Sequence, residues 1–229
     1  YLGRSPVLNR QLAVGGYEFQ LQLPAGIDPA TRDALLLDKL LHEGGSLCSG
    51  RRLTFIPLHP LSLNLPQIER LPTDNLVLQI AALEPGLPAD QATAIAARIA
   101  ALRGKGHALA LDCALADRTS GANYLHIDVK GGDPIWLLEQ QKRCNSAYPN
   151  TPLIARNIDS LEMLDACRKL PFQHFQGSYL DQRKEWTQPR IDGGRTVILE
   201  LIGGLKQEDV DFKTLARIAS QDLHLYYRL

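Results

Sequence analysis

Short apolar runs and amphipathic segments alternate along the first 180 residues of this chain. The apolar or alternating runs are bounded by glycine, proline and polar residues, a pattern that predicts strands. The predicted strands are residues 1–8 and 14–23, which form an entrance hairpin, and residues 53–58, 75–82, 108–111, 124–127, 152–155 and 172–175. The segments between them predict helices at residues 28–43, 88–103, 135–144 and 160–169, with Asp28 and Ser160 as N-caps. Such alternation indicates an α/β fold with a parallel sheet, either open or closed into a barrel.

Pro57 lies inside the predicted strand at residues 53–58. A proline in a central strand removes one hydrogen bond of the ladder. We therefore expect this strand to end or bend at Pro57.

Two of the buried runs end on a single aspartate, Asp112 after residues 108–111 and Asp128 after residues 124–127. The carboxyl ends of parallel strands meet at one edge of a sheet, where α/β folds place their sites. The two acids could therefore hold a hard divalent cation together. Alternatively, each aspartate caps the turn or helix that follows its strand.

The overall composition argues against several classes of protein. Hydrophobic residues make up 45% of the chain, and Lys plus Arg equals Asp plus Glu at 25 each. This neutral balance, without a basic run, argues against a dedicated nucleic-acid or membrane-surface protein. The cysteines (Cys48, Cys113, Cys144 and Cys167) show no CxxC spacing, so we expect neither a zinc site nor a disulfide framework. With no apolar stretch of membrane-spanning length and no signal peptide, we expect a soluble cytoplasmic protein.

The composition shifts after the last predicted strand. Residues 183–194 are polar, with a proline and two glycines, and predict a linker. Residues 195–204 and 210–221 have helical spacing, and residues 221–229 restart an amphipathic helix that stops in mid-pattern. This segment is too short for a packed domain of its own. It either docks on the first domain or begins a second one, and we expect the second.

Several stretches, in this order, carry a resemblance to a known family. They are the opening YLGRSPVLNR and VGGYEF, the strand endings LALD and HIDV, and the segment FQHFQGSYL. The chain resembles the EAL domains, bacterial cyclic di-GMP phosphodiesterases built on a modified TIM-type (β/α) barrel. The tail LIGGLKQEDVDFKTLARIASQDLHLYYRL is similar to the first two helices of an HDOD domain. The resemblance implies an EAL-like barrel at residues 1–182, the linker at 183–194, and a short all-α, HDOD-like segment at 195–229.

The same resemblance implies a set of site positions. Members of this family hydrolyse cyclic di-GMP with two Mg²⁺ or Mn²⁺ ions held by carboxylates, an Asn and a Gln. The positions that keep a site-like side chain are Glu18, Gln79, Asp112, Asp128 and Gln176, with Gln79 in place of a glutamate. The substituted positions are Gln22 for the phosphate-binding arginine, Pro57 for a metal-binding asparagine, Cys113 for an aspartate, His126 for a lysine and Arg156 for a glutamate.

These substitutions predict a site without catalysis or bound metal. Two-metal hydrolysis needs nearly the full carboxylate set, and Arg156 places a cation where a metal would bind. The surviving residues have structural alternatives, such as pairing of Glu18 with Arg156 across the barrel mouth. We regard His126 as a polar lining residue rather than a metal ligand.

We therefore expect a non-catalytic signal-transduction module that acts as a scaffold or regulatory protein-interaction domain. One alternative is a receptor that binds cyclic di-GMP without hydrolysis, and another is an active phosphodiesterase that uses Mg²⁺ or Mn²⁺. An unrelated TIM-barrel enzyme using Asp112, Asp128 and His126 is a further alternative. The expected partners are other signalling proteins, with a second copy of the chain or cyclic di-GMP also considered, but neither nucleic acid nor a membrane.

Overall fold

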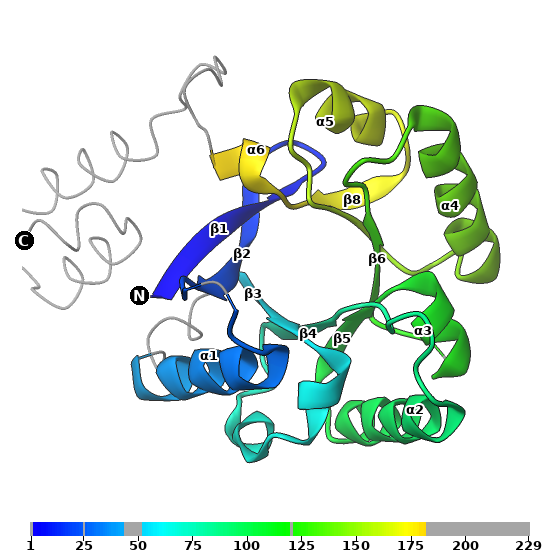
Figure 1. Ribbon diagram of the computed structural model, residues 1–229. Helices are drawn as coiled ribbons and strands as arrows, with labels where there is room; N and C mark the ends of the chain where they lie inside the picture. The colour runs from blue at the N-terminus through cyan, green and yellow to red at the C-terminus, as the bar shows by residue number, and fades with distance from the viewer. Residues whose placement is uncertain (1, 25, 44–51, 120, 182–229) are drawn as a thin grey trace, which may run out of the picture. The chain divides into compact units, whose positions relative to one another are not determined.

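The computed structural model describes residues 2–24, 26–43, 52–119 and 121–181. In this part of the chain, eight strands form one closed barrel in sequence order (Figure 1). They are β1 (Leu2–Asn9), β2 (Val14–Leu21), β3 (Leu53–Leu58), β4 (Leu76–Ile80), β5 (Ala108–Leu111), β6 (Tyr124–Asp128), β7 (Leu153–Arg156) and β8 (Phe172–Phe175). Strand β1 is antiparallel to both β2 and β8, whereas the pairs from β2 to β8 are parallel. The carboxyl ends of β2 to β8 therefore open at one end of the barrel, which we call the mouth.

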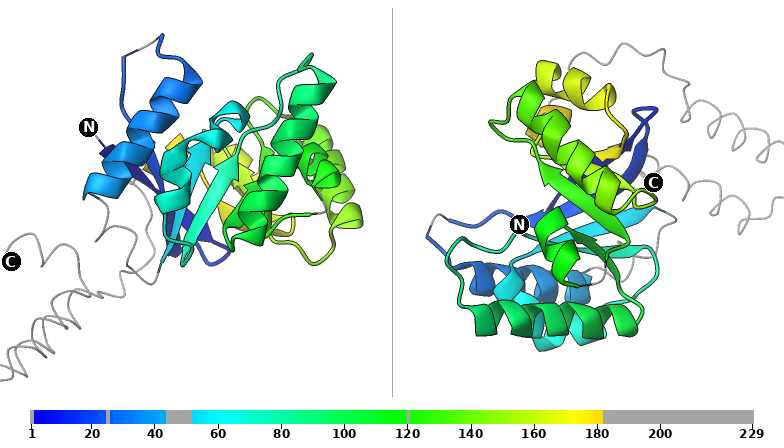
Figure 2. Two further views of the ribbon diagram at one scale, coloured as in Figure 1. Left: turned by 90° about the horizontal axis from the view of Figure 1, so that it is seen from below. Right: turned by 90° about the vertical axis from the view of Figure 1, so that its right-hand side faces the viewer.

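Helices surround the strands (Figures 1 and 2). They are α1 (Pro29–Glu43), the short 3₁₀ helices η1 (Pro60–Asn64) and η2 (Pro66–Arg70), α2 (Ala89–Gly104), α3 (Cys113–Arg118), α4 (Pro134–Ala147), α5 (Leu161–Arg168) and α6 (Ser178–Asp181). Two predicted N-caps are confirmed: Asp28 Oδ1 accepts a hydrogen bond from the Thr31 amide at 2.9 Å, and Ser160 Oγ accepts one from the Met163 amide at 3.2 Å. The short elements η1, η2, α3 and α6 were not predicted.

Side chains fill the interior of the barrel. Because strand residues alternate between the two faces, five different strands each contribute one residue to a buried cluster. The cluster consists of Val7, Phe55, Val77, Ala110 and Ile154. The rings of Tyr124 and His174 pack around Phe55, with centroids 6.1 and 6.3 Å from its own. The predicted α/β barrel is thus confirmed, and it is the closed form of the two that the pattern allowed.

We expected strand β3 to end or bend at Pro57, but the strand does not end there. It continues to Leu58 and stays paired with β4 up to that residue. The Thr54 amide donates to the Asn75 carbonyl and the Ala81 amide donates to the Leu58 carbonyl, so Thr54 and Leu58 both bond toward β4. Since successive residues of a parallel strand face alternate neighbours, Pro57 faces β2, and the pairing with β2 has already ended at Phe55. The missing N–H of the proline therefore interrupts no ladder.

The remaining predictions about domain organisation concern the end of the chain. The contacts divide the chain into residues 1–182 and 183–229. The predicted linker at 183–194 and the all-α segment at 195–229 lie outside the described residues and stay predictions. Within the described ranges, no helix combines the length and apolar character needed to cross a membrane.

Candidate functional site at the barrel mouth

The barrel mouth contains two cavities, of about 290 and 330 Å³, that share Glu18 and Gln20. Strand β2 presents both side chains to the mouth because they are two residues apart. Lys130 and Asp159 are among the other residues that line the first cavity. The second cavity lies toward β3, β4 and α1 and includes Arg156.

Glu18 and Arg156 face each other across the mouth. Glu18 Oε2 lies 4.0 Å from Arg156 Nη2, and the two side chains are only 10% and 16% exposed. The other carboxylate oxygen, Oε1, accepts a hydrogen bond from Gln20 Nε2 at 2.7 Å. Because the pair is largely buried, water and salt screen its attraction less than on the surface. Both oxygens of the Glu18 carboxylate therefore have partners within the protein.

Gln79 and Gln176 form a buried pair of amides. Gln79 Nε2 donates to Gln176 Oε1 at 2.8 Å, and Gln176 Nε2 reaches Gln79 Oε1 at 3.4 Å. Gln79 lies on β4 and Gln176 directly follows β8, so the pair joins two non-neighbouring strands across the interior. Each amide thereby satisfies the other, as buried polar groups must. Neither carbonyl oxygen is left without a donor.

Asp112 and Asp128 each accept a backbone hydrogen bond from a residue that follows their own strand. Asp112 is the N-cap of α3 and accepts from the Leu115 amide at 2.7 Å. Burial raises the pKa of Asp112, and the Leu115 hydrogen bond opposes this rise. Asp128 is exposed, and its oxygens accept from the Lys130 amide at 3.0 Å and from Asn157 Nδ2 at 2.7 Å. Both aspartates therefore have the capping geometry that was the alternative to a metal site.

The described residues contain no group of three or more His, Cys, Asp or Glu side chains placed to hold a metal ion. At the mouth, the predicted acidic side chains already have partners within the protein. Glu18 is paired with Arg156, and Asp112 and Asp128 are bonded to backbone or amide N–H groups.

Known structures share this barrel. The Bacillus subtilis YkuI protein, with an EAL domain and in complex with its substrate c-di-GMP and calcium, matches with a TM-score of 0.59 at 16% identity, over 95% of this chain and 64% of that one. The calcium and cyclic di-GMP complex of Klebsiella pneumoniae BlrP1 matches with a TM-score of 0.58 at 18% identity, over 77% of this chain and 54% of that one. The c-di-GMP complex of the PaMucR phosphodiesterase matches with a TM-score of 0.55 at 16% identity, over 79% and 90%.

This chain has the barrel fold of EAL domains. It spans less than two thirds of YkuI and of BlrP1. No protein-family model and no curated protein sequence matches it. Since identities below a fifth preserve fold but not a set of site residues, the likeness extends to the fold alone.

Two of the positions that the resemblance counts as substituted are buried. Cys113 is the first residue of α3 and lies beside Cys144 of α4; burial, with a smaller contribution from Cys113, raises the pKa of the Cys144 thiol. His126 points into the barrel, where its Nε2 lies 2.8 Å from the Ile80 carbonyl oxygen. Burial, and then the neighbouring Arg156 cation, lower the pKa of His126 to about 3, against the opposing effect of the Ile80 hydrogen bond. His126 is therefore a neutral donor to a backbone carbonyl.

We expect His126 to make the protein less stable in mild acid. Its pKa in the folded state, about 3, is below the value near 6.5 of a free histidine. Unfolding therefore takes up a proton, and stability is lost as the pH falls from about 6.5 toward 3. At pH 5 the loss from this residue is about 2 kcal/mol. Urea unfolding at pH 7 and pH 5 should show that His126→Gln, which can still donate to Ile80, loses about 2 kcal/mol less than the wild type over this interval. Equal losses of stability in the two proteins would contradict a neutral, buried His126 in the folded state.

The structure places Gln22 away from the mouth cavities. Strand β2 ends at Leu21, and Gln22 is exposed and lines neither cavity. Gln20, which sequence reasoning did not select, lines both, and the alternation that places Glu18 inside could have identified it. Lys130 and Asp159 were also missed. They follow the ends of β6 and β7, and only the barrel geometry brings these loops together.

Proposed function

We propose that this chain is a non-catalytic signal-transduction module in which an EAL barrel serves as a scaffold or regulatory protein-interaction domain. The observation that carries the proposal is the Arg156 guanidinium, 4.0 Å from Glu18 at the mouth. The resemblance to EAL domains implies acidic metal ligands at both positions. A fixed cation there repels a metal ion and occupies the carboxylate that would bind one.

The other mouth residues do not fit a pair of divalent cations. Two-metal catalysis needs open, anionic oxygen ligands that hold both ions close together. Here Gln79 and Gln176 satisfy each other, and Asp112 caps a helix. Protein partners, including a second copy of the chain, stay predictions of this proposal.

The direct test is an assay of cyclic di-GMP hydrolysis. The full chain, incubated with the nucleotide and Mg²⁺ or Mn²⁺, should form no linear dinucleotide above the rate of a protein-free control. Metal-dependent turnover that scales with protein concentration would overturn the proposal.

A gain of metal binding would support the role of Arg156. We expect the double variant Arg156→Glu/Gln79→Glu, which surrounds Glu18 with two further acids, to bind Mn²⁺ in calorimetric titration where the wild type gives no heat. Arg118→Glu/Gln91→Glu makes the same change in net charge at exposed positions and should bind no more Mn²⁺ than the wild type. Equal binding by the two variants would show that total charge, rather than the position of the acids at the mouth, determines Mn²⁺ binding.

A receptor that binds cyclic di-GMP without cleaving it is the second candidate. It is favoured by the cations Lys130 and Arg156 beside the mouth cavities, and by the complexes of the structural neighbours with this nucleotide. Titration with cyclic di-GMP in the presence of a metal chelator distinguishes the two. Saturable heat that Arg156→Ala removes would favour the receptor over the scaffold.

A further inference from the structure

Two arginines hold one tyrosine on the outer face of the barrel. The guanidinium carbon of Arg4 lies 4.7 Å from the centroid of the Tyr17 ring, and that of Arg52 lies 5.9 Å from it. Arg52 Nη1 also donates a hydrogen bond to the Tyr17 hydroxyl at 3.0 Å. Both arginines are exposed, whereas Tyr17 is half-buried. We call these three side chains the arginine–tyrosine cluster.

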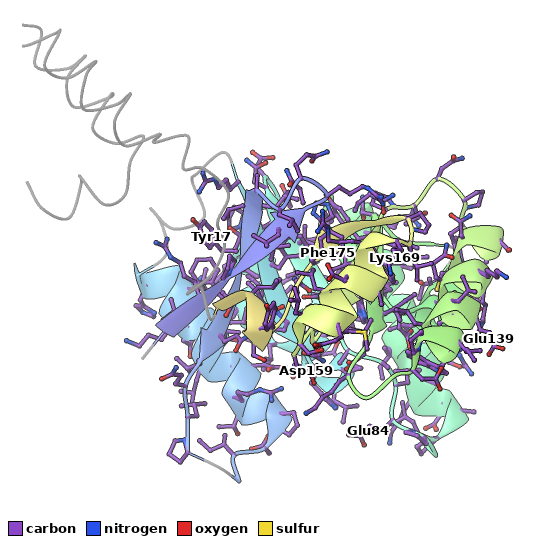
Figure 3. All side chains as sticks on the ribbon, turned by 90° about the horizontal axis from the view of Figure 1, so that it is seen from above. Tyr17, Glu84, Glu139, Asp159, Lys169 and Phe175 are labelled. Atoms are coloured by element: carbon purple, nitrogen blue, oxygen red, sulfur yellow. The ribbon has the colours of Figure 1, made fainter. Side chains whose placement is uncertain are left out.

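None of the three cluster side chains lines either mouth cavity, although the neighbouring Pro6 and Leu21 do. Tyr17 pairs with Pro6 of β1 and with Thr54 of β3, and Glu18, the next residue, points to the inside. Tyr17 therefore points outward. Figure 3 shows Tyr17 on the side of the barrel away from Asp159 and Glu84, which mark the mouth.

Within the part of the chain that the structure describes, the two positive charges of the cluster have no acidic partner. Among the described residues, no carboxylate forms an ion pair with Arg4 or Arg52. By contrast, the exposed Lys105 does have such a partner in Glu69. Two guanidinium groups on one ring repel each other, and the attraction of each to the ring face offsets part of this repulsion.

We propose that the arginine–tyrosine cluster binds an acidic segment of a partner protein. Arginine forks match carboxylate geometry, and Arg and Tyr are the residue types that dominate binding energy at protein interfaces. The ring and the Arg52 hydrogen bond already fix the guanidinium groups, which lowers the entropy lost on binding. The surrounding Leu2, Pro6 and Leu21 are half-buried, so an acidic segment with apolar neighbours fits this face. This inference rests on the proposed function as an interaction domain.

A protein partner suits the cluster better than a membrane or a nucleic acid does. The chain has no net charge, 25 basic residues against 25 acidic ones. Surfaces that bind lipid headgroups or phosphate backbones spread many cations over a wide area. A single fixed pair of arginines instead matches one or two carboxylates at a defined place.

The test is fluorescence anisotropy with a labelled peptide of about ten glutamates, in about 50 mM salt so that screening is weak. We expect the wild type to bind it saturably, and Arg4→Glu/Arg52→Glu to weaken binding at least about tenfold. The matched control Arg70→Glu/Arg118→Glu reverses two exposed charges elsewhere and should change the affinity less than about threefold. Tyr17→Leu keeps both charges but frees the arginines, and should weaken binding several-fold.

Each opposite result would overturn the inference. These results are no binding by the wild type, equal losses in the two double variants, or no loss in Tyr17→Leu. Sedimentation with phosphatidylserine vesicles that depends on Arg4 and Arg52, without peptide binding, would assign the cluster to a lipid surface instead. Hydrolysis of cyclic di-GMP would overturn the proposed function and leave peptide binding intact, so the two failures are distinguishable.

Discussion

Gly177→Ala is expected to destabilise the protein by at least about 3 kcal/mol. Gly177 has a φ of +153°, which residues with a side chain rarely adopt, and a Cβ there would lie within 3.0 Å of both the carbonyl oxygen and the nitrogen of Ile158. Backbone hydrogen bonds hold this contact, since the Ile158 amide donates to Gln176 and its carbonyl accepts from Tyr179. Neither segment can move aside without breaking them. Urea unfolding at pH 7 measures the loss.

A matched glycine separates backbone strain from the clash. Gly86 has a φ of +87°, and a Cβ at this position would meet no other atom within 4 Å. Gly86→Ala should therefore lose only about 1 kcal/mol, from its backbone conformation alone. A loss for Gly177→Ala no larger than that for Gly86→Ala would contradict the role of the close contact. Because Gly177 follows Gln176, we also expect the variant to separate the Gln79–Gln176 amide pair.

Phe55→Ala is the second change with a large expected effect, a loss of about 3 to 5 kcal/mol. Phe55 is fully buried in the barrel interior, and its ring packs against those of Tyr124 and His174. Removing it opens a cavity that the surrounding strands cannot fill, because the barrel is closed. The free energy of unfolding from urea titration is the measurement.

The control for this change is Phe55→Leu. Leucine keeps most of the apolar volume and should lose only about 1 to 2 kcal/mol, including the aromatic contacts. If alanine and leucine were equally harmful, the ring geometry rather than the cavity would determine the effect. A loss below about 1 kcal/mol for Phe55→Ala would contradict the packing described for the interior.

The sequence allowed some mouth residues to be predicted and left the roles of others open. Glu18 and Gln176 could be assigned to the mouth from the resemblance, and the structure brings both to the same cavity. Asp112 and Asp128 left two alternatives open, because an aspartate after a strand looks the same in a cap and in a metal site. In the structure, hydrogen bonds from Leu115, Lys130 and Asn157 give both aspartates a capping geometry, which depends on where the following loop turns.

By itself, the sequence determined the order of strands and helices and two of their N-caps, and its resemblance to EAL domains predicts that half of the acidic positions implied at the mouth are replaced. These features are local, because periodicity and capping involve residues within a few positions of one another. Only the tertiary structure decided that the sheet closes, through the pairing of Leu8 on β1 with Phe175 on β8. It also decided that Arg156 faces Glu18 and that Arg4 and Arg52 meet on Tyr17. Such contacts join residues far apart in the chain, and their distances depend on the twist and register of every strand between them.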